Sequence, residues 1–387
     1  MRALLLIGLL LLGNGLAQAC EFSDVSFKSD FEMAKLDTCS QLSDGAFMLE
    51  TTPENRPINH SPWYAFKVLA KKPKDLEINL RFDGERPRYL PKISHNGRDW
   101  SNIDFDLHDG VMTFYVKATT TPLWIAGQEL FGNQKYSDWL DELGQNKAYQ
   151  RFQLGKSTQG RPIGALLSTQ ADNKEWLILL GRQHPPEVTG ALAMLPFTEM
   201  VLSDSPLAQK FRARFNIFMV PNLNPDGVTN GHWRHNVNGI DLNRDWKNFN
   251  QIETRIVRDK LNEIVASGGK MVMGVDFHST QQDVFYTIPT DYTVAPSNLV
   301  EDWLAKVKKN TASSFVVRNK PGVSPGRGVF KQYFTDTYKV HAITYEMGDN
   351  TNRKMITHVA KQAANTLMET MLATPSSAFY FKDKTSQ

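Results

Sequence analysis

The spacing of apolar and polar positions divides the chain near residue 130. Before that point apolar residues recur at every second position in short runs, and turn-forming pairs such as Asn96-Gly97 separate the runs. The clearest runs cover residues 63–68, 76–82 and 111–116. Short strands with regular turns are typical of a β-sandwich. We therefore predict a small antiparallel β-sandwich domain over residues 20–130.

The pattern changes after a polar, partly helical connecting segment at residues 131–147. Strand-like runs then alternate with helical stretches as far as residue 375. The strand-like runs cover residues 175–180, 215–220, 270–277 and 342–345, and the helical stretches lie near residues 189–202, 251–266, 295–312 and 357–372. This alternation predicts an α/β domain over residues 148–375, with a mixed, mostly parallel sheet and helices on both faces. Residues 376–387 are expected to form a loose tail.

The first 19 residues have the composition of a signal peptide. Arg2 precedes an apolar run, and Ala17-Gln18-Ala19 matches the small-residue pattern of a cleavage site. The run is shorter than the roughly 20 residues that a membrane span needs, and no later stretch is apolar for long enough. We expect an exported protein, periplasmic or secreted, with no transmembrane segment in the mature chain.

The chain contains two cysteines, Cys20 and Cys39. In an exported protein such a pair predicts one disulfide, although two free thiols or a lipidated Cys20 are alternatives. Lysine and arginine number 44 against 41 aspartates and glutamates, for a net charge of +3. Because these charges are not clustered, the sequence argues against a nucleic-acid partner.

A histidine and a glutamate follow an apolar run of the second domain. The run at residues 177–180 stops at Gly181, and His184 and Glu187 come next in the pattern His-x-x-Glu. His278 follows a second apolar run, at residues 271–275. Ligands of open α/β sheets bind at the carboxyl ends of the strands, and His and Glu are ordinary zinc ligands. Two cysteines cannot form a four-cysteine site, so these residues are the candidate ligands of a metal.

A long polar block at residues 222–246 is the second candidate for function. It carries Arg234 and Arg244, whose guanidinium groups can bind carboxylates through two hydrogen bonds, and Asn243 stands beside the latter. A long loop rich in aromatic and arginine residues is more often functional than a plain connection. Glu346 ends the short apolar run near residue 345 and is a candidate general base.

Together these motifs resemble the zinc carboxypeptidase family of funnel-shaped α/β metallopeptidases. The matching residues, in order, are His184-x-x-Glu187, Asn224-Pro225-Asp226-Gly227, Trp233-Arg234, the hexapeptide Asp241 to Trp246, His278 and Glu346. The resemblance covers residues 148–375. The preceding domain, with the stretch SPWYAFKV at residues 61–68, resembles the cytosolic carboxypeptidase branch and its bacterial relatives. The signal-like segment departs from that branch, so a cytosolic location is not implied.

The resemblance implies roles for the metal ligands and the catalytic groups. His184, Glu187 and His278 would bind one Zn²⁺ and leave a position for water. Glu346 would take a proton from that water and pass it to the leaving amine. Arg234 would contact the substrate and stabilise the oxyanion that forms at the scissile carbonyl.

The resemblance also implies how the substrate's end is recognised. Asn243 and Arg244 would bind the terminal α-carboxylate, and Asp241 would orient a zinc histidine by a hydrogen bond. The residue that reads the terminal side chain falls near Lys331, with Arg327 as a possible helper, and a lysine there favours an acidic C-terminal residue. The family's mobile tyrosine is not assigned, because residues 320–329 contain none.

Three functions follow from these observations. The first is an exported zinc metallocarboxypeptidase that acts on the C-termini of peptides or proteins. The second is an amidase or carboxypeptidase of peptidoglycan stem peptides, which are acidic and carry free carboxylates. The third is a non-catalytic peptide- or glycan-binding protein on the same scaffold, against which the presence of every zinc ligand and the base argues.

Overall fold

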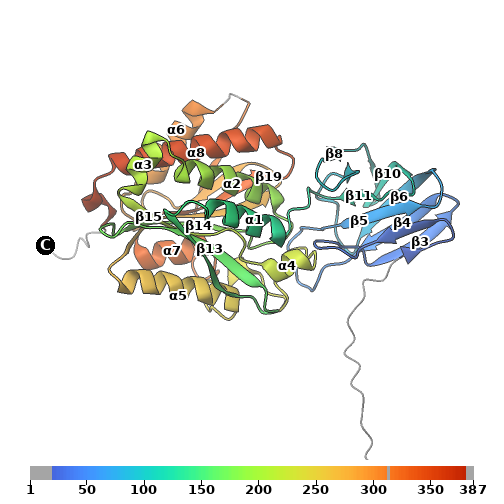
Figure 1. Ribbon diagram of the computed structural model, residues 1–387, viewed down its shortest axis with the longest axis horizontal. Helices are drawn as coiled ribbons and strands as arrows, with labels where there is room; N and C mark the ends of the chain where they lie inside the picture. The colour runs from blue at the N-terminus through green and yellow to red at the C-terminus, as the bar shows by residue number, and fades with distance from the viewer. Residues whose placement is uncertain (1–19, 312–313, 381–387) are drawn as a thin grey trace, which may run out of the picture.

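The computed structural model describes residues 20–311 and 314–380, and its ribbon has two lobes side by side (Figure 1). The lobe drawn in blue to cyan contains the N-terminal strands, and the lobe drawn in green to red contains the later strands and most of the helices. The predicted signal peptide, residues 1–19, lies outside the described residues, as do residues 381–387 of the predicted tail. Within the described part, no helix combines the length and apolar character that crossing a membrane requires.

Two sheets form the N-terminal lobe, with strand orders β1-β2-β5-β11-β7-β8 and β3-β4-β6-β10-β9. The strands are β1 (Cys20–Glu21), β2 (Val25–Lys28), β3 (Thr38–Ser43), β4 (Ala46–Thr51), β5 (Ala65–Ala70), β6 (Lys74–Phe82), β7 (Lys92–Ser94), β8 (Ser101–Asn102), β9 (Asp106–His108), β10 (Val111–Ala118) and β11 (Leu123–Ala126). A disulfide between Cys20 of β1 and Cys39 of β3 joins the two sheets. Buried and exposed residues alternate along β10, as the sequence pattern predicts.

One strand pair of this lobe departs from the purely antiparallel sandwich that we expected. β4 and β6 pair in parallel, whereas the other pairs of the two sheets are antiparallel. Between these two strands the chain passes through β5, which belongs to the opposite sheet. Parallel neighbours need such a crossover, and residue spacing alone does not reveal it.

The second lobe contains one sheet, with strand order β12-β13-β15-β14-β16-β19-β17-β18. Its strands are β12 (Tyr149–Lys156), β13 (Pro162–Ser168), β14 (Glu175–Gly181), β15 (Phe215–Val220), β16 (Lys270–Thr280), β17 (Val284–Thr287), β18 (Asn319–Pro321) and β19 (Ala342–Gly348). The central strands β15, β14, β16 and β19 run parallel. β12 and β13 pair antiparallel with their neighbours, and β17 pairs antiparallel with β19 but parallel with β18. The predicted mixed, mostly parallel sheet is therefore confirmed at its centre.

Helices cover both faces of this sheet. They are α1 (Asn133–Leu143), α2 (Val188–Leu202), α3 (Pro206–Arg212), α4 (Pro225–Thr229), α5 (Ile252–Ala266), α6 (Leu299–Asn310), α7 (Phe330–Tyr338) and α8 (Arg353–Ala373), with short 3₁₀ turns η1 (Leu242–Arg244) and η2 (Ser376–Phe379). Figure 1 shows α2, α3, α6 and α8 on one side of the sheet and α5 and α7 on the other. Every residue of β14 and β15 is buried, which is why these strands are continuous apolar runs.

The first residues after α8 do not form the loose tail that we expected. Residues 376–379 form η2, and Phe379 is 6% exposed. Its ring lies 6.3 Å from that of Phe215. A buried aromatic residue in a polar segment packs this stretch on the core, together with contacts to Arg214 and Glu175, and the composition of the segment does not reveal it.

Candidate active site

The loop between β14 and α2 places His184 and Glu187. Arg182 has a positive φ of 51°, and its buried guanidinium donates from Nε to the carbonyl oxygen of Pro185 at 2.9 Å. A Cβ added to Gly181 would stand 2.6 Å from the sulfur of Met194. The turn therefore depends on a glycine where the strand meets α2 and on an arginine that holds the loop's backbone.

His278 lies near the end of β16, across from the start of α2. A Cβ added to Gly190 of α2 would stand 2.5 Å from the carbonyl oxygen of His278. The missing side chain lets the helix approach the strand closely enough for Glu187, just before the helix, to reach His278. The carboxylate contact is 2.7 Å, between Oε2 and Nδ1.

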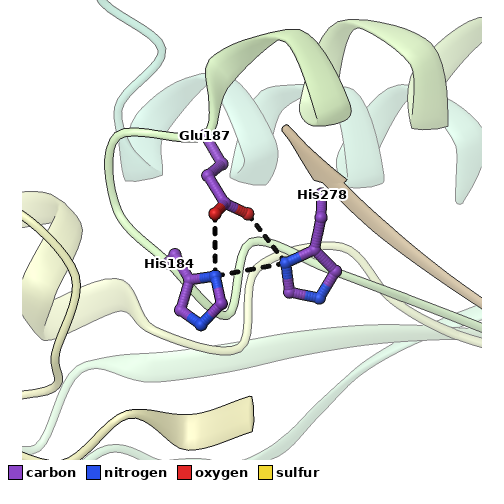
Figure 2. Close-up of side chains that lie close together, drawn as sticks. All are labelled: His184, Glu187 and His278. Carbon is purple, nitrogen blue, oxygen red and sulfur yellow. Dashed lines mark hydrogen bonds and ion pairs between the residues drawn. The ribbon is translucent and has the colours of Figure 1, made fainter. Parts of the chain in front are cut away.

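His184, Glu187 and His278 direct their polar atoms at one another (Figure 2). Nδ1 of His184 is 2.9 Å from Oε1 of Glu187 and 3.2 Å from Nδ1 of His278. All three side chains are buried, and one ligand atom from each lies within 4.8 Å of the others. Ligand atoms around a tetrahedral zinc ion are roughly 3.3 Å apart, given bonds of about 2 Å, so these separations are close to those that a zinc site requires.

The outer nitrogens of the two histidines each face a carboxylate. Nε2 of His184 is 2.8 Å from Oδ1 of Asp241, and Nε2 of His278 is 2.8 Å from Oδ2 of Asp276. When Nε2 carries the hydrogen, the Nδ1 lone pair of each ring points toward the oxygens of Glu187. Several lone pairs that converge on one point repel one another unless a cation lies between them. Carboxylate–histidine pairs of this kind are also typical of zinc sites. The residues present therefore fit a zinc ion.

Protons compete for the same lone pairs. Burial alone lowers the pKa of His278, but the charges of Asp276 and Glu187 outweigh it and raise the pKa well above its usual value. Burial alone raises the pKa of Glu187, but His184 and His278 bring it well below the usual value. The electrostatic environment of these three residues therefore favours the binding of a cation.

Asp241 connects the predicted zinc ligand His184 to the predicted substrate-binding residues. Besides His184, its Oδ1 accepts the backbone N–H of Asn243 at 2.8 Å, which caps η1. Its Oδ2 accepts a hydrogen bond from Nε of Arg234 at 2.8 Å, and Nη1 of Arg244 lies 4.0 Å from the same oxygen. Burial raises the pKa of Asp241, but the charges of these partners, led by His184, lower it well below the usual value. One ionised carboxylate therefore orients a histidine and an arginine.

Asn243 and Arg244 lie on η1, at the wall of the same cleft. Oδ1 of Asn243 accepts the backbone N–H of Phe330 at 2.9 Å, and this bond fixes the orientation of the amide. Nη1 of Arg244 donates to the carbonyl oxygen of Asn243 at 2.7 Å. The side chain of Arg244 is 33% exposed, so its remaining donors are open to a ligand.

Glu346 stands beside His278 in the sheet, because β16 and β19 pair in parallel with these two residues opposite each other. Its Oε2 is buried and has no hydrogen-bond partner among the described residues. Burial, together with the nearby charge of Glu187, raises the pKa of Glu346 to about 7. A carboxylate with that pKa can both accept and donate a proton near neutral pH.

Lys331 lies on α7 and contributes to the cleft wall. The residue is 6% exposed, and Nζ donates to the carbonyl oxygens of Thr287 at 2.8 Å and Gly322 at 2.6 Å. Burial lowers its pKa to about 8. No ion pair to Lys331 occurs among the described residues, and an ammonium has three donors, so one donor is free for a ligand.

All of the predicted metal and substrate residues except Asp241 line one cleft of about 430 Å³. The basic side chains there are Arg88, Arg234, Arg244, Arg327 and Lys331, and the carboxylates are Glu187 and Glu346. Tyr286 of β17 also lines the cleft, whereas Tyr333 stacks on Trp246 with ring centroids 5.7 Å apart. The excess of basic groups favours an anionic ligand.

Two members of this site were not identified from the sequence. Asp276 precedes His278 by two residues on one strand, so both side chains lie on the same face, and that spacing was a readable signal. Arg88 comes from the N-terminal lobe, and no local pattern indicates that it reaches the cleft.

Solved structures share the two-lobed architecture. A metallo-carboxypeptidase from Burkholderia cenocepacia aligns with a TM-score of 0.78 at 18% identity, over 90% of this chain and 99% of that one. A metallo-carboxypeptidase from Pseudomonas aeruginosa, solved in complex with (2-guanidinoethylmercapto)succinic acid, aligns with a TM-score of 0.75 at 19% identity, over 89% and 98% of the two chains. The fold of this chain is thus that of the bacterial metallo-carboxypeptidases.

Comparisons of sequence also relate this chain to carboxypeptidases. An uncharacterized protein of Zymomonas mobilis is 26% identical over 220 residues, which are 55% of this chain and 57% of that protein. Cytosolic carboxypeptidase 6 of Mus musculus is 24% identical over 281 residues, which are 61% and 49% of the two chains. The matched part is about half the length of these curated relatives. A family model described as zinc carboxypeptidase matches residues 136–373, which include every predicted ligand and Glu346, and the chain belongs to the zinc carboxypeptidase family.

Proposed function

We propose that the protein is a zinc-dependent metallocarboxypeptidase that hydrolyses the C-terminal peptide bond of peptides or proteins. The observation that carries this proposal is the convergence of His184, Glu187 and His278 in the cleft that Glu346 also lines. Family membership supports the reaction class, and the cleft supplies a place for the end of a peptide.

The metal and Glu346 account for attack on the peptide bond. A zinc ion held by the three ligands would polarise the scissile carbonyl and lower the pKa of the attacking water. Glu346 accepts a proton from water on its carboxylate and then donates it to the leaving amine. Its unpartnered Oε2 and its raised pKa suit both steps.

Arg244 and Arg234 recognise different negatively charged groups of the substrate. Arg244 and Asn243, which both line the cleft, bind the terminal α-carboxylate through guanidinium and amide donors. Arg234 donates to the oxyanion that forms when the carbonyl becomes tetrahedral. Its guanidinium is held by Asp241 at 2.8 Å and approaches Oε1 of Glu187 to 3.9 Å, which places it beside the proposed metal site.

The finer proposal concerns the terminal side chain. Lys331 has no carboxylate partner among the described residues, and its two carbonyl contacts leave a donor for a ligand. An acidic terminal residue supplies the missing counterion, so peptides that end in glutamate or aspartate are the preferred substrates. Export, proposed from residues 1–19 alone, would place the enzyme where acidic stem peptides of the cell wall are also available.

A peptide-library digest read by mass spectrometry tests these proposals together. Wild-type protein loaded with zinc should remove single C-terminal residues, and glutamate faster than leucine or lysine. Glu346→Gln should retain zinc and release no residue. Peptides with γ-linked or D-residues test the cell-wall alternative. Release of internal fragments or faster removal of lysine would contradict, respectively, the exopeptidase activity and the acidic preference.

A further inference from the structure

The loop that carries Arg234 is held by the N-terminal lobe. Glu54 follows β4, and its carboxylate accepts the backbone N–H groups of three consecutive residues of that loop. Oε2 is 2.7 Å from the nitrogen of Trp233, and Oε1 is 3.0 Å from that of Arg234 and 2.5 Å from that of His235. The side chain of Glu54 is 7% exposed. Hydrogen bonds to a charged and largely buried acceptor are strong.

The side chain of Trp233 is anchored in the same lobe. It is fully buried in the hydrophobic cluster of the sandwich, with its ring 6.4 Å from Phe82 in an edge-to-face arrangement. Asn55, next to Glu54, donates from Nδ2 to the carbonyl oxygen of Gly239 at 3.1 Å. The sandwich thus holds this loop by its backbone and by one aromatic side chain.

These contacts determine where the guanidinium of Arg234 lies. Its side chain is 10% exposed, and its guanidinium is held by a hydrogen bond from Nε to Asp241 and by a longer ion pair, 3.9 Å, from Nη1 to Glu187. A donor that stabilises a transition state must be placed within about 0.5 Å. With one short hydrogen bond at the head of a long side chain, that accuracy also requires a fixed backbone at Arg234.

We propose that Glu54 is a positioning residue for Arg234, and that the sandwich thereby completes the oxyanion site. Glu54 acts through the backbone of residues 233–235 and does not contact the substrate. This inference rests on the proposed function, because it concerns the step in which Arg234 stabilises the transition state. It assigns the N-terminal lobe a part in the reaction.

Steady-state kinetics on the full zinc-loaded chain test the proposal with Glu54→Gln and Glu54→Ala. We expect kcat to fall about 10-fold for Gln and about 100-fold for Ala, the loss that a misplacement of roughly 1 Å causes. KM and zinc content should stay near wild type, because the ligands and the carboxylate-binding residues are untouched. Glu50→Gln is the matched control, since the carboxylate of Glu50 in the same lobe pairs with the exposed Arg81 and accepts the hydroxyl of Thr38. It should behave as wild type.

A double-mutant cycle with Arg234→Ala separates positioning from general destabilisation. If Glu54 acts through Arg234, adding Glu54→Ala to Arg234→Ala should lower kcat by less than 2-fold. Hydrogen exchange of residues 230–240 should also accelerate in Glu54→Ala and not in Glu50→Gln.

Each alternative outcome has a distinct meaning. A wild-type kcat in both Glu54 variants, or a full further loss in the Arg234→Ala background, overturns the positioning role and leaves the proposed function intact. If Glu54→Ala does not fold, Glu54→Gln and its cycle decide the question. A zinc-loaded wild-type protein that releases no C-terminal residue overturns both proposals.

Discussion

Arg88 of the sandwich and Asp349 at the end of β19 form a buried ion pair with two hydrogen bonds. Nε donates to Oδ2 at 2.8 Å and Nη2 to Oδ1 at 3.2 Å, and the side chains are 6% and 2% exposed. Nη2 also donates to the carbonyl oxygen of Ser279 at 2.9 Å. Ser279 follows His278, so one guanidinium ties together the strand ends that carry a proposed zinc ligand and Glu346.

Loss of this arginine should destabilise the whole chain. Arg88→Gln leaves Asp349 buried without its partner, and such a change costs about 3–5 kcal/mol. Urea unfolding followed by tryptophan fluorescence measures the loss. Arg81→Gln, which breaks the exposed pair with Glu50, should cost no more than about 1 kcal/mol. Equal effects of the two substitutions would contradict the importance of the buried pair.

Zinc content should depend on each proposed ligand. Wild-type protein should hold about one zinc per chain, and His184→Ala or His278→Ala should lose it, because two remaining ligands bind weakly. Elemental analysis of dialysed protein measures this. A chelator should abolish hydrolysis, and added zinc should restore it. Retention of stoichiometric zinc by both histidine variants would exclude this site.

Asp276 should tune zinc affinity without binding the metal. Asp276→Asn keeps the shape of the side chain but removes the charge that supports Nε2 of His278. Affinity should fall roughly 10- to 100-fold, as is usual for residues behind a metal ligand. Competition with a fluorescent chelator gives the constant. An unchanged constant would show that the contact at 2.8 Å is not important for zinc binding.

The preference for acidic termini should decline at alkaline pH. Burial lowers the pKa of Lys331 to about 8, so the ammonium is charged below that pH and loses its proton above it. The ratio of kcat/KM for peptides ending in glutamate to that for leucine should therefore fall as pH rises through 8. Using the ratio cancels the titration of Glu346, which affects both substrates.

The variant Lys331→Met provides the companion test. It should lower kcat/KM for glutamate-terminated peptides roughly 10- to 100-fold, the worth of a hydrogen bond to a charged group. Activity on leucine-terminated peptides should change little, and the pH dependence of the ratio should disappear. A variant that still prefers glutamate would remove Lys331 from the specificity pocket.

Local patterns were sufficient to predict the central strands of the sheet and to name candidate zinc ligands at their ends. The buried strands β14, β16 and β19 are apolar runs, and parallel strands bring their carboxyl ends to one edge. The sequence alone therefore predicts that His184, His278 and Glu346 lie close together. The family motifs then supplied candidate roles for Arg234 and Arg244. Spacing also predicted α2, α5, α6 and α8 to within a few residues, whereas the shorter helices α3, α4 and α7 were not predicted.

Long-range contacts could not be predicted in this way. Glu54 is 180 residues from Arg234, and Arg88 is 261 residues from Asp349. Neither Glu54 nor Arg88 stands in a recognisable motif. A carboxylate or guanidinium in a turn-rich loop is normally solvated, so the sequence gives no reason to expect either side chain to be buried. The parallel pairing of β4 with β6 was missed for the same reason, because it depends on which sheet each strand joins.

The burial of Trp233 in the sandwich has a consequence for how the chain melts. The cluster that contains it combines residues from both lobes, including Val188 and Val228 beside Phe47 and Phe66. The sandwich therefore closes its hydrophobic core only with residues of the second lobe, although the second lobe also has two clusters of its own. Calorimetry should record one cooperative transition for the entire chain. A fragment that begins after residue 130 should expose the indole of Trp233, because the sandwich that buries it is missing.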